Sequence, residues 1–176
     1  MTDTELKKLV IEKINNLVEG AKKDYPQLYD IVIPEIKFTK RGKVSGCVEY
    51  EYESVKAFNF NMVLLRENTE SFLETTVPHE IAHFLVHFLH GFSYTRSGRR
   101  IIHGKNWKNM MRYLGVDPNR CHSYNTDNCT TRRLKKFTYK CGCRSYELTS
   151  IRHNRVMKGT ANYRCKHCGQ SLEYVG

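Results

Sequence analysis

Two histidines four residues apart, His79 and His83, most constrain how this chain folds. They belong to Val77-Pro78-His79-Glu80-Ile81-Ala82-His83, a His-Glu-x-x-His motif. On an α-helix, side chains four residues apart project from one face about 6 Å apart, so both imidazoles reach a single zinc ion. Glu80 is then placed to take a proton from a metal-activated water. The competing interpretation is an amphipathic helix that carries two histidines by chance.

The helix that carries the motif is expected from about residue 70 to residue 90. Its inward face is supplied by Phe72, Leu73, Thr76, Val77 and Ile81. Pro78 deletes one backbone hydrogen bond and clashes with the preceding turn, so the helix is either kinked there or begins near residue 76.

Two histidines leave a zinc ion under-coordinated, so a third ligand is expected from another element. His87, eight residues after His79, lies about 12 Å along the helix axis and is too far away. His90 is excluded on similar grounds, and only four carboxylates follow the helix. His103 is the best candidate, because Gly104 permits close approach and a helix anchored by Trp107, Met110, Met111 and Leu114 follows it.

The first ninety residues predict the rest of the core. Apolar residues at three- and four-residue intervals predict an amphipathic helix over 4–23, and β-type segments at 35–39, 46–52 and 57–61 predict a small antiparallel meander. Cys47 has no nearby ligand partner and is expected to be a buried thiol. The segment 91–100, which contains Tyr94, is expected to be a loop beside the cleft.

Charge is divided unevenly along the 176 residues. The net charge is +11, yet residues 1–90 carry 11 Lys+Arg and 14 Asp+Glu, whereas residues 91–176 carry 18 and 4. Such a one-sided field favours a polyanionic partner, of which nucleic acid is the commonest. Acidic protein surfaces, a membrane face and solubility alone are the alternative interpretations. The polar start of the chain and the lack of a long apolar run predict a soluble, intracellular, cytoplasmic protein that does not enter membranes.

Four of the seven cysteines form two close pairs, Cys141-Gly142-Cys143 and Cys165-Lys166-His167-Cys168. Two such pairs across a β-rich segment are typical of a zinc ribbon, in which four thiolates close a structural site. Cys-x-Cys departs from the commoner Cys-x-x-Cys, so His153 or His167 is an alternative fourth ligand. Free or redox-active thiols are the competing interpretation.

Basic residues are concentrated on or beside this cysteine block, where they would neutralise phosphates without reading bases. The aromatic side chains between them either stack on unpaired bases or form the core of the ribbon, and for Phe137 and Tyr139 a core role is expected. The candidate nucleic-acid ligands are Arg132, Arg133, Lys135, Lys136, Lys140, Arg144, Arg152, Arg155, Lys158 and Arg164.

The motif, the His103-Gly104 pair with its helix, and the cysteine block together resemble the SprT-like zinc metalloproteases, a family that includes bacterial SprT and the DNA-protein crosslink protease Spartan. The resemblance covers roughly residues 5–176. It implies that His79, His83 and His103 bind a catalytic zinc and that Glu80 is the catalytic acid and base. The resemblance to Spartan further implies substrates that are bound or crosslinked to DNA.

These observations predict an α+β chain of three parts. Residues 1–118 form a SprT-like metalloprotease domain with a small antiparallel sheet, 119–136 a linker, and 137–176 a basic zinc ribbon. We expect a monomer with one catalytic and one structural zinc ion, protein substrates, and DNA bound without sequence preference. Tyr94, Tyr124 and His122 are candidates for stabilising an oxyanion. The alternatives are a nucleic-acid-binding zinc protein with a silent hydrolase site, and a hydrolase of small amides.

Overall fold

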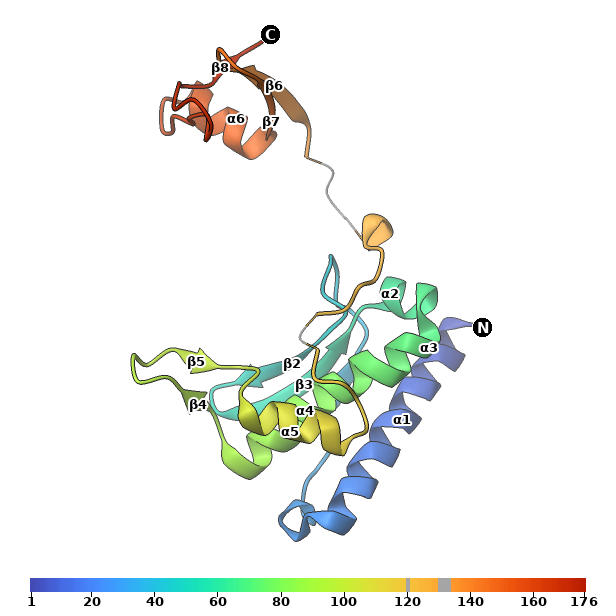
Figure 1. Ribbon diagram of the computed structural model, residues 1–176. Helices are drawn as coiled ribbons and strands as arrows, with labels where there is room; N and C mark the ends of the chain where they lie inside the picture. Colours follow the sequence, from blue (N-terminus) through green and yellow to red (C-terminus); the bar gives the residue numbers. More distant parts are fainter. Residues whose placement is uncertain (120, 130–133) are drawn as a thin grey trace. The chain divides into compact units, whose positions relative to one another are not determined.

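A computed structural model describes residues 1–119, 121–129 and 134–176 (Figure 1). The chain divides into two compact units, Met1–Thr131 and Arg132–Gly176. Arg132 and Arg133, two of the predicted nucleic-acid ligands, lie outside the described residues.

The first unit begins with the longest helix, α1 (Asp3–Asp24). The Thr2 side chain accepts a hydrogen bond from the Glu5 backbone, and the Glu5 carboxylate accepts one from the Thr2 backbone, so a capping box starts the helix. Its buried face repeats at helical spacing. The predicted helix over residues 4–23 is therefore confirmed. The residues of this face are Leu6, Val10, Ile14, Val18 and Ala21.

Three short strands follow, β1 (Glu35–Lys37), β2 (Gly46–Glu51) and β3 (Ser54–Phe60). They lie in the order β1-β3-β2, with β1 parallel and β2 antiparallel to β3. The three strands were predicted, but the all-antiparallel meander is wrong. The segment Ala57–Phe60 is buried throughout, so β3 takes the central position and leaves β2 at an edge.

The motif lies on a helix with an irregular start. After α2 (Met62–Glu67) come the single turn α3 (Thr69–Ser71), a π-helical turn (Phe72–Thr76) and α4 (Val77–His90). Pro78 lies in the first turn of α4. The wider π turn accommodates a proline that cannot donate a hydrogen bond to the preceding turn. Helical turns therefore follow one another from residue 69 to residue 90, with the irregular turn just before Pro78.

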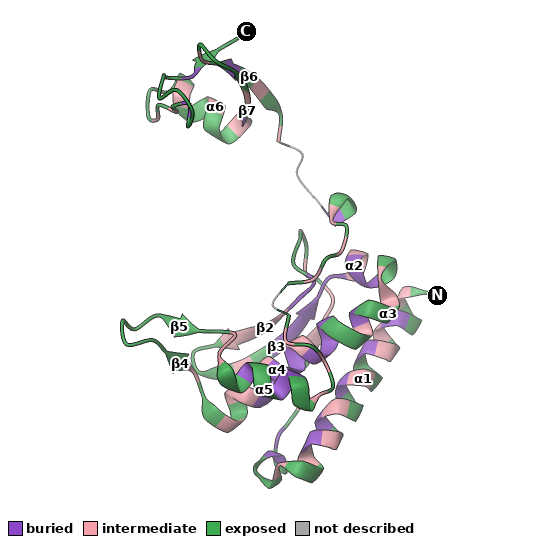
Figure 2. Ribbon diagram, in the orientation of Figure 1, coloured by how far each residue is buried: buried purple, intermediate pink, exposed green. Residues whose placement is uncertain are grey.

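The helices α1 and α4 pack together and against the sheet, with the apolar core between them (Figure 2). Helix α5 (Lys105–Tyr113) packs against α4 and buries Trp107, Met110 and Met111, as predicted. Between α4 and α5, the expected loop forms a two-stranded hairpin of β4 (Ser93–Tyr94) and β5 (Arg100–Ile101). Short 3-10 turns occur at Pro26–Leu28 and Asp127–Cys129.

The second unit is a small sheet with one helix. Strands β6 (Lys136–Lys140), β7 (Ser145–Thr149) and β8 (Glu173–Tyr174) lie in the order β7-β6-β8, and α6 (Ser150–Met157) follows β7. Its core contains Tyr139, Leu148, Cys165 and Leu172. The predicted α+β class with a C-terminal zinc ribbon is confirmed. In the described part of the chain, no helix is both long and apolar enough to cross a membrane.

Candidate metal centres

Three imidazoles from two helical segments converge in the first unit. His79 and His83 come from consecutive turns of α4, and His103 comes from the segment just before α5. Their Nε2 atoms form a triangle with each side 3.2 Å long. The structure therefore brings together the three residues that the sequence selected as ligands.

This triangle fits a zinc ion. Nitrogens that are each about 2.0–2.1 Å from a tetrahedral zinc lie about 3.3 Å from one another. Each neutral Nε2 either donates or accepts a hydrogen bond, so at least two of the three nitrogens are alike and cannot hydrogen-bond to each other. Three protein ligands leave a fourth position open, as in catalytic rather than structural sites.

Backbone groups fix the orientation of the first ligand. His79 hydrogen-bonds through its ring to the backbone of Asn119, and this contact raises the pKa of the imidazole. The indole N–H of Trp107 points at the carbonyl of His79 at 3.5 Å. A Cβ on Gly104 would lie 2.9 Å from Cγ2 of Ile101, so the glycine allows the close approach that brings His103 to the site.

Burial keeps the rings of His79 and His83 neutral. It lowers the pKa of His79 to about 4, with a further lowering by His103, and it lowers the pKa of His83 to about 2. A neutral imidazole is the form that binds metal, so the unit does not need to remove protons from these rings near neutral pH.

Glu80 lines the same cavity and is almost completely buried, with 5% of its surface exposed. Burial raises the pKa of its carboxyl group to about 8, while a hydrogen bond from the Val48 backbone and the charge on Lys40 lower it. A metal cation beside the carboxylate would favour the ionised form and lower this pKa further. Strand β2 thus holds the carboxylate at the edge of the metal triangle.

The cavity around the triangle has a volume of about 1100 Å³. One wall is the edge strand β2, another is the hairpin end with Arg100, and a third is formed by residues of the irregular segments 116–119 and 121–126. Cys47 lines this cavity and is only half-buried, so its prediction as a buried thiol is wrong. Strand β2 exposes one edge to the cavity, and the sequence pattern did not show that Cys47 lies there.

His122 and Tyr124 belong to the irregular wall, and local contacts hold both side chains. The ring of His122 stacks on Tyr124 and its Nε2 donates to the carbonyl of Lys43 at 3.1 Å. The Tyr124 hydroxyl lies 3.2 Å from the Thr75 hydroxyl and 3.1 Å from that of Thr76. Tyr94 instead lies on β4 with 57% of its surface exposed and does not line this cavity.

The two histidines excluded by helix geometry do not join the triangle, although His87 lines the same cavity. His87 packs against the rings of Tyr50 and Phe92, and its Nε2 lies 2.7 Å from the carbonyl of Glu53. His90 is exposed. Neither residue belongs to the group of side chains that converge on the metal position.

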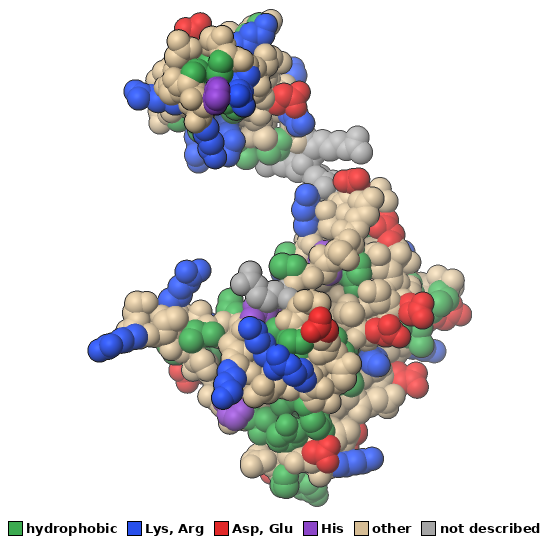
Figure 3. Space-filling model, viewed as in Figure 1, with side chains coloured by type: hydrophobic (Ala, Val, Ile, Leu, Met, Phe, Trp, Pro, Cys, Tyr) green, Lys and Arg blue, Asp and Glu red, His purple; other side chains and the backbone are tan. Residues whose placement is uncertain are grey.

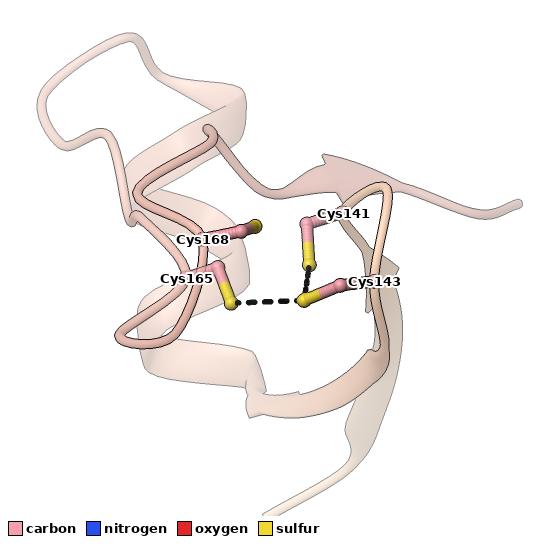
Figure 4. Close-up of side chains that lie close together, drawn as sticks. All are labelled: Cys141, Cys143, Cys165 and Cys168. Carbon is pink, nitrogen blue, oxygen red and sulfur yellow. Dashed lines mark hydrogen bonds between the residues drawn. The ribbon is translucent and has the colours of Figure 1, made fainter.

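The second unit brings four sulfurs together (Figure 4). The Sγ atoms of Cys141 and Cys143 are 3.4 Å apart, those of Cys143 and Cys165 are 3.6 Å apart, and all four, with Cys168, lie within 4.8 Å of one another. Sulfurs about 2.3 Å from a tetrahedral zinc lie about 3.8 Å apart, so this cluster fits zinc. Four protein ligands close the site, as in structural zinc centres.

Two polar side chains support the cysteine cluster, and the sequence did not identify either. The hydroxyl of Tyr146 lies 2.9 Å from Sγ of Cys165 and, together with the backbone N–H groups of Cys168 and His167, lowers the pKa of that thiol to about 5. Oε1 of Gln170 accepts a hydrogen bond from the Gly142 backbone at 2.9 Å, and this contact joins the two knuckles. The contacts of Tyr146 with Cys165 and of Gln170 with Gly142 join residues that are distant in sequence, so spacing alone did not reveal them.

His153 turns away from the cluster. It stacks on Phe137 with ring centres 3.7 Å apart, and its Nδ1 lies 3.0 Å from the hydroxyl of Tyr139. His167 approaches the cluster through its backbone N–H, which points at Sγ of Cys165. Among the described residues, the group that converges here contains four cysteines and no imidazole. Tyr139 is fully buried, as expected of a core aromatic.

The predicted nucleic-acid ligands that the structure describes are all exposed on the second unit. Lys136 forms an ion pair with Glu147 at 2.8 Å. The other described members of the predicted set are Lys135, Lys140, Arg144, Arg152, Arg155, Lys158 and Arg164.

Comparison with known proteins matches a separate family model to each of the two units. The SprT-like family matches residues 13–133, and the SprT-like zinc ribbon domain matches residues 135–176. Protein SprT of Escherichia coli O139:H28 is 40% identical over 164 residues, which cover 92% of this chain and 87% of the relative. Proteins SprT of E. coli strain K12 / DH10B and of Shigella boydii serotype 18 are each 40% identical over 153 residues, covering 85% of this chain and 80% of those proteins. No solved structure matches the chain. The family expected from the motifs is confirmed, and the chain belongs to the SprT-like family with a SprT-like zinc ribbon after its first unit.

Proposed function

We propose that this protein is a zinc-dependent metalloendopeptidase that hydrolyses peptide bonds of proteins bound or crosslinked to DNA. The observation that carries the proposal is the triangle of imidazole nitrogens 3.2 Å apart beside the buried Glu80, in a cavity large enough for a peptide.

His79, His83 and His103 would hold the zinc ion. When bound, zinc acts as a Lewis acid that lowers the pKa of water and stabilises the negative charge that develops on a carbonyl oxygen. Glu80, positioned by the Val48 amide, accepts the proton of the attacking water and delivers it to the departing amine. Burial excludes bulk water from this carboxylate. Its proton is therefore exchanged with the attacking water and the departing amine rather than with solvent.

Charge on the second unit supports the nucleic-acid part of the proposal. Residues 132–176 carry 11 Lys+Arg and 2 Asp+Glu. Side chains of this kind bind phosphates without selecting a base sequence. Recruitment to DNA in the cytoplasm would raise the concentration of DNA-bound proteins at the cavity. Proteins on the same DNA would therefore be the preferred substrates.

The proposal is tested with the zinc-loaded full chain and a DNA-binding protein as substrate, without DNA and with single- or double-stranded DNA. Cleavage is expected, DNA should increase its rate, and Glu80→Gln should abolish it while both zinc ions stay bound. Absence of cleavage under every condition would argue for a nucleic-acid-binding zinc protein with a silent site. Cleavage that ignores DNA would favour a hydrolase of small amides or free peptides.

A further inference from the structure

In the first unit, positive charges are concentrated in one stretch of the chain. Residues 1–131 carry 18 Lys+Arg and 16 Asp+Glu, so the unit is nearly balanced. Residues 81–116 nevertheless contain six Lys+Arg and no Asp or Glu. All six are exposed, and we call them the hairpin-helix surface: Arg96, Arg99, Arg100, Lys105, Lys108 and Arg112.

The fold arranges these cations on two neighbouring elements. The three arginines lie on the β4-β5 hairpin, from which blue side chains project in Figure 3. Lys105, Lys108 and Arg112 follow each other at intervals of three and four along α5, so they form a stripe with about one helical turn between cations. The stripe faces away from the buried residues Trp107 and Met111.

The surface is not neutralised by the unit itself. In the described part of the chain, the ion pairs of the first unit use Lys22, Lys37, Lys56 and Arg66, and none uses a cation of the hairpin-helix surface. A face that served only solubility would mix both signs, as α1 does with its alternating Lys and Glu. Like charges gathered on one face repel each other, so a bound polyanion would stabilise the surface.

The surface reaches the mouth of the cavity. Arg100 and Lys105 line the same cavity as the metal triangle, and His103 lies between them in the chain. Tyr94, 57% exposed on β4, adds a flat ring next to the arginines. A polymer bound along this surface would therefore pass beside the metal position.

We propose that the hairpin-helix surface binds the phosphates of nucleic acid at the mouth of the cavity, as a contact of the first unit that is independent of the ribbon. The inference deepens the proposed function and rests on it for the identity of the polyanion. Nucleic acid fits better than an acidic protein, because its charges recur regularly along the polymer, as the cations of α5 do, and because an exposed tyrosine stacks on unpaired bases. A protein attached to that DNA is thereby presented to the cavity.

The test uses the zinc-loaded full chain and three paired substitutions. Arg96→Gln with Arg99→Gln neutralises the hairpin, and Lys108→Gln with Arg112→Gln neutralises α5. Lys8→Gln with Lys23→Gln removes the same charge from exposed positions on α1 and is the matched control. None of these residues lines the cavity. Affinity for labelled duplex and single-stranded oligonucleotides is measured by fluorescence anisotropy over a series of salt concentrations, with zinc content as the check on folding.

Removing one cation that binds a phosphate lowers the slope of log affinity against log salt by about 0.9 for duplex and about 0.7 for single strands. Each hairpin or α5 pair should therefore lower the slope by about 1.4–1.8, and the α1 pair should leave it unchanged.

Equal slopes in all three variants and the unchanged chain would overturn the inference and leave DNA binding to the ribbon alone. Binding of polyglutamate is measured in parallel as a model of an acidic protein. Equal slopes for DNA, together with loss of polyglutamate binding in the hairpin and α5 variants, would overturn the inference in favour of an acidic protein partner. A full chain that binds neither form of DNA would remove the nucleic-acid part of the proposed function and this surface with it.

Discussion

Gly46 on the edge strand β2 lies against the side chain of Glu80. A Cβ at position 46 would lie 3.1 Å from Cγ of Glu80 and 3.0 Å from Cδ1 of Phe60. The missing side chain lets β2 approach α4 closely enough for the Val48 amide to hold the buried carboxylate. A residue far from the motif in sequence therefore controls where the motif glutamate lies.

Gly46→Ala should displace Glu80 without removing the metal. We expect the peptidase kcat to fall by about 10- to 100-fold, since small misplacements of a reacting group are costly. Overpacking should lower the free energy of unfolding by about 1–3 kcal/mol. Steady-state kinetics, zinc content and urea denaturation measure these effects. Gly20→Ala on α1 is the control, because a Cβ at position 20 would meet no atom within 4 Å and alanine favours helix. Unchanged kinetics in Gly46→Ala would contradict the role of this contact.

The buried Glu80 should make the metal-free first unit less stable as pH rises. Its pKa is about 8 in the fold and 4.5 ordinarily, so the unfolded chain releases this proton first, and stability is lost between about pH 4.5 and 8. Glu80→Gln should therefore stabilise the metal-free unit by more than about 1 kcal/mol at pH 8 and by much less at pH 5. Trp107, the only tryptophan, reports unfolding of this unit by fluorescence. An equal effect at both pH values would contradict the buried, protonated carboxyl group.

The two metal sites should lose their ions independently. We expect two zinc ions per chain, with one lost in His103→Ala and the other in Cys165→Ser, because the ligand sets belong to separate units. Metal analysis by mass spectrometry measures the content, and Trp107 fluorescence should stay native in Cys165→Ser. His90→Ala, at an exposed position, should keep both ions. Loss of both ions from either ligand variant would show that the sites depend on each other.

Tyr146→Phe should weaken zinc binding by the ribbon. The variant removes the hydroxyl that lies 2.9 Å from Sγ of Cys165, and loss of such a supporting hydrogen bond costs about 10- to 100-fold in metal affinity. Transfer of zinc to a chromogenic chelator measures the change. Tyr174→Phe removes a hydroxyl from the partly exposed end of the same sheet and should leave transfer unchanged. Identical transfer from both variants would rule out this role for Tyr146.

Tyr124→Phe should act on stability more than on catalysis. Its hydroxyl contacts the hydroxyls of Thr75 and Thr76 at 3.2 and 3.1 Å, so the variant should lose about 1 kcal/mol of unfolding free energy. The peptidase kcat should change by less than about 10-fold, well short of the effect of losing an oxyanion donor. Tyr94→Phe, at an exposed position, should change neither quantity. A fall in kcat of more than about 100-fold at constant KM would instead identify Tyr124 as that donor.

Features that depend on local spacing could be predicted from the sequence. The His-Glu-x-x-His interval gives two imidazoles on one helical face, the apolar repeat gives α1, and the two cysteine pairs predict the knuckles of the ribbon. His103 could also be predicted as the third ligand. The distance along a helix excludes His87 and His90, and few acidic residues follow the helix.

Contacts between segments that are distant in sequence became evident only from the fold. It places β1 parallel to β3, sets Gly46 against Glu80, turns the expected loop at residues 91–100 into a hairpin, and brings the Asn119 backbone to His79. Hydrophobic periodicity defines the face that a segment buries but not its neighbour, because strand order and close contacts depend on the path of the whole chain. The metal ligands could therefore be predicted from the sequence. The groups that position them, and the cationic surface beside them, could be identified only from the fold.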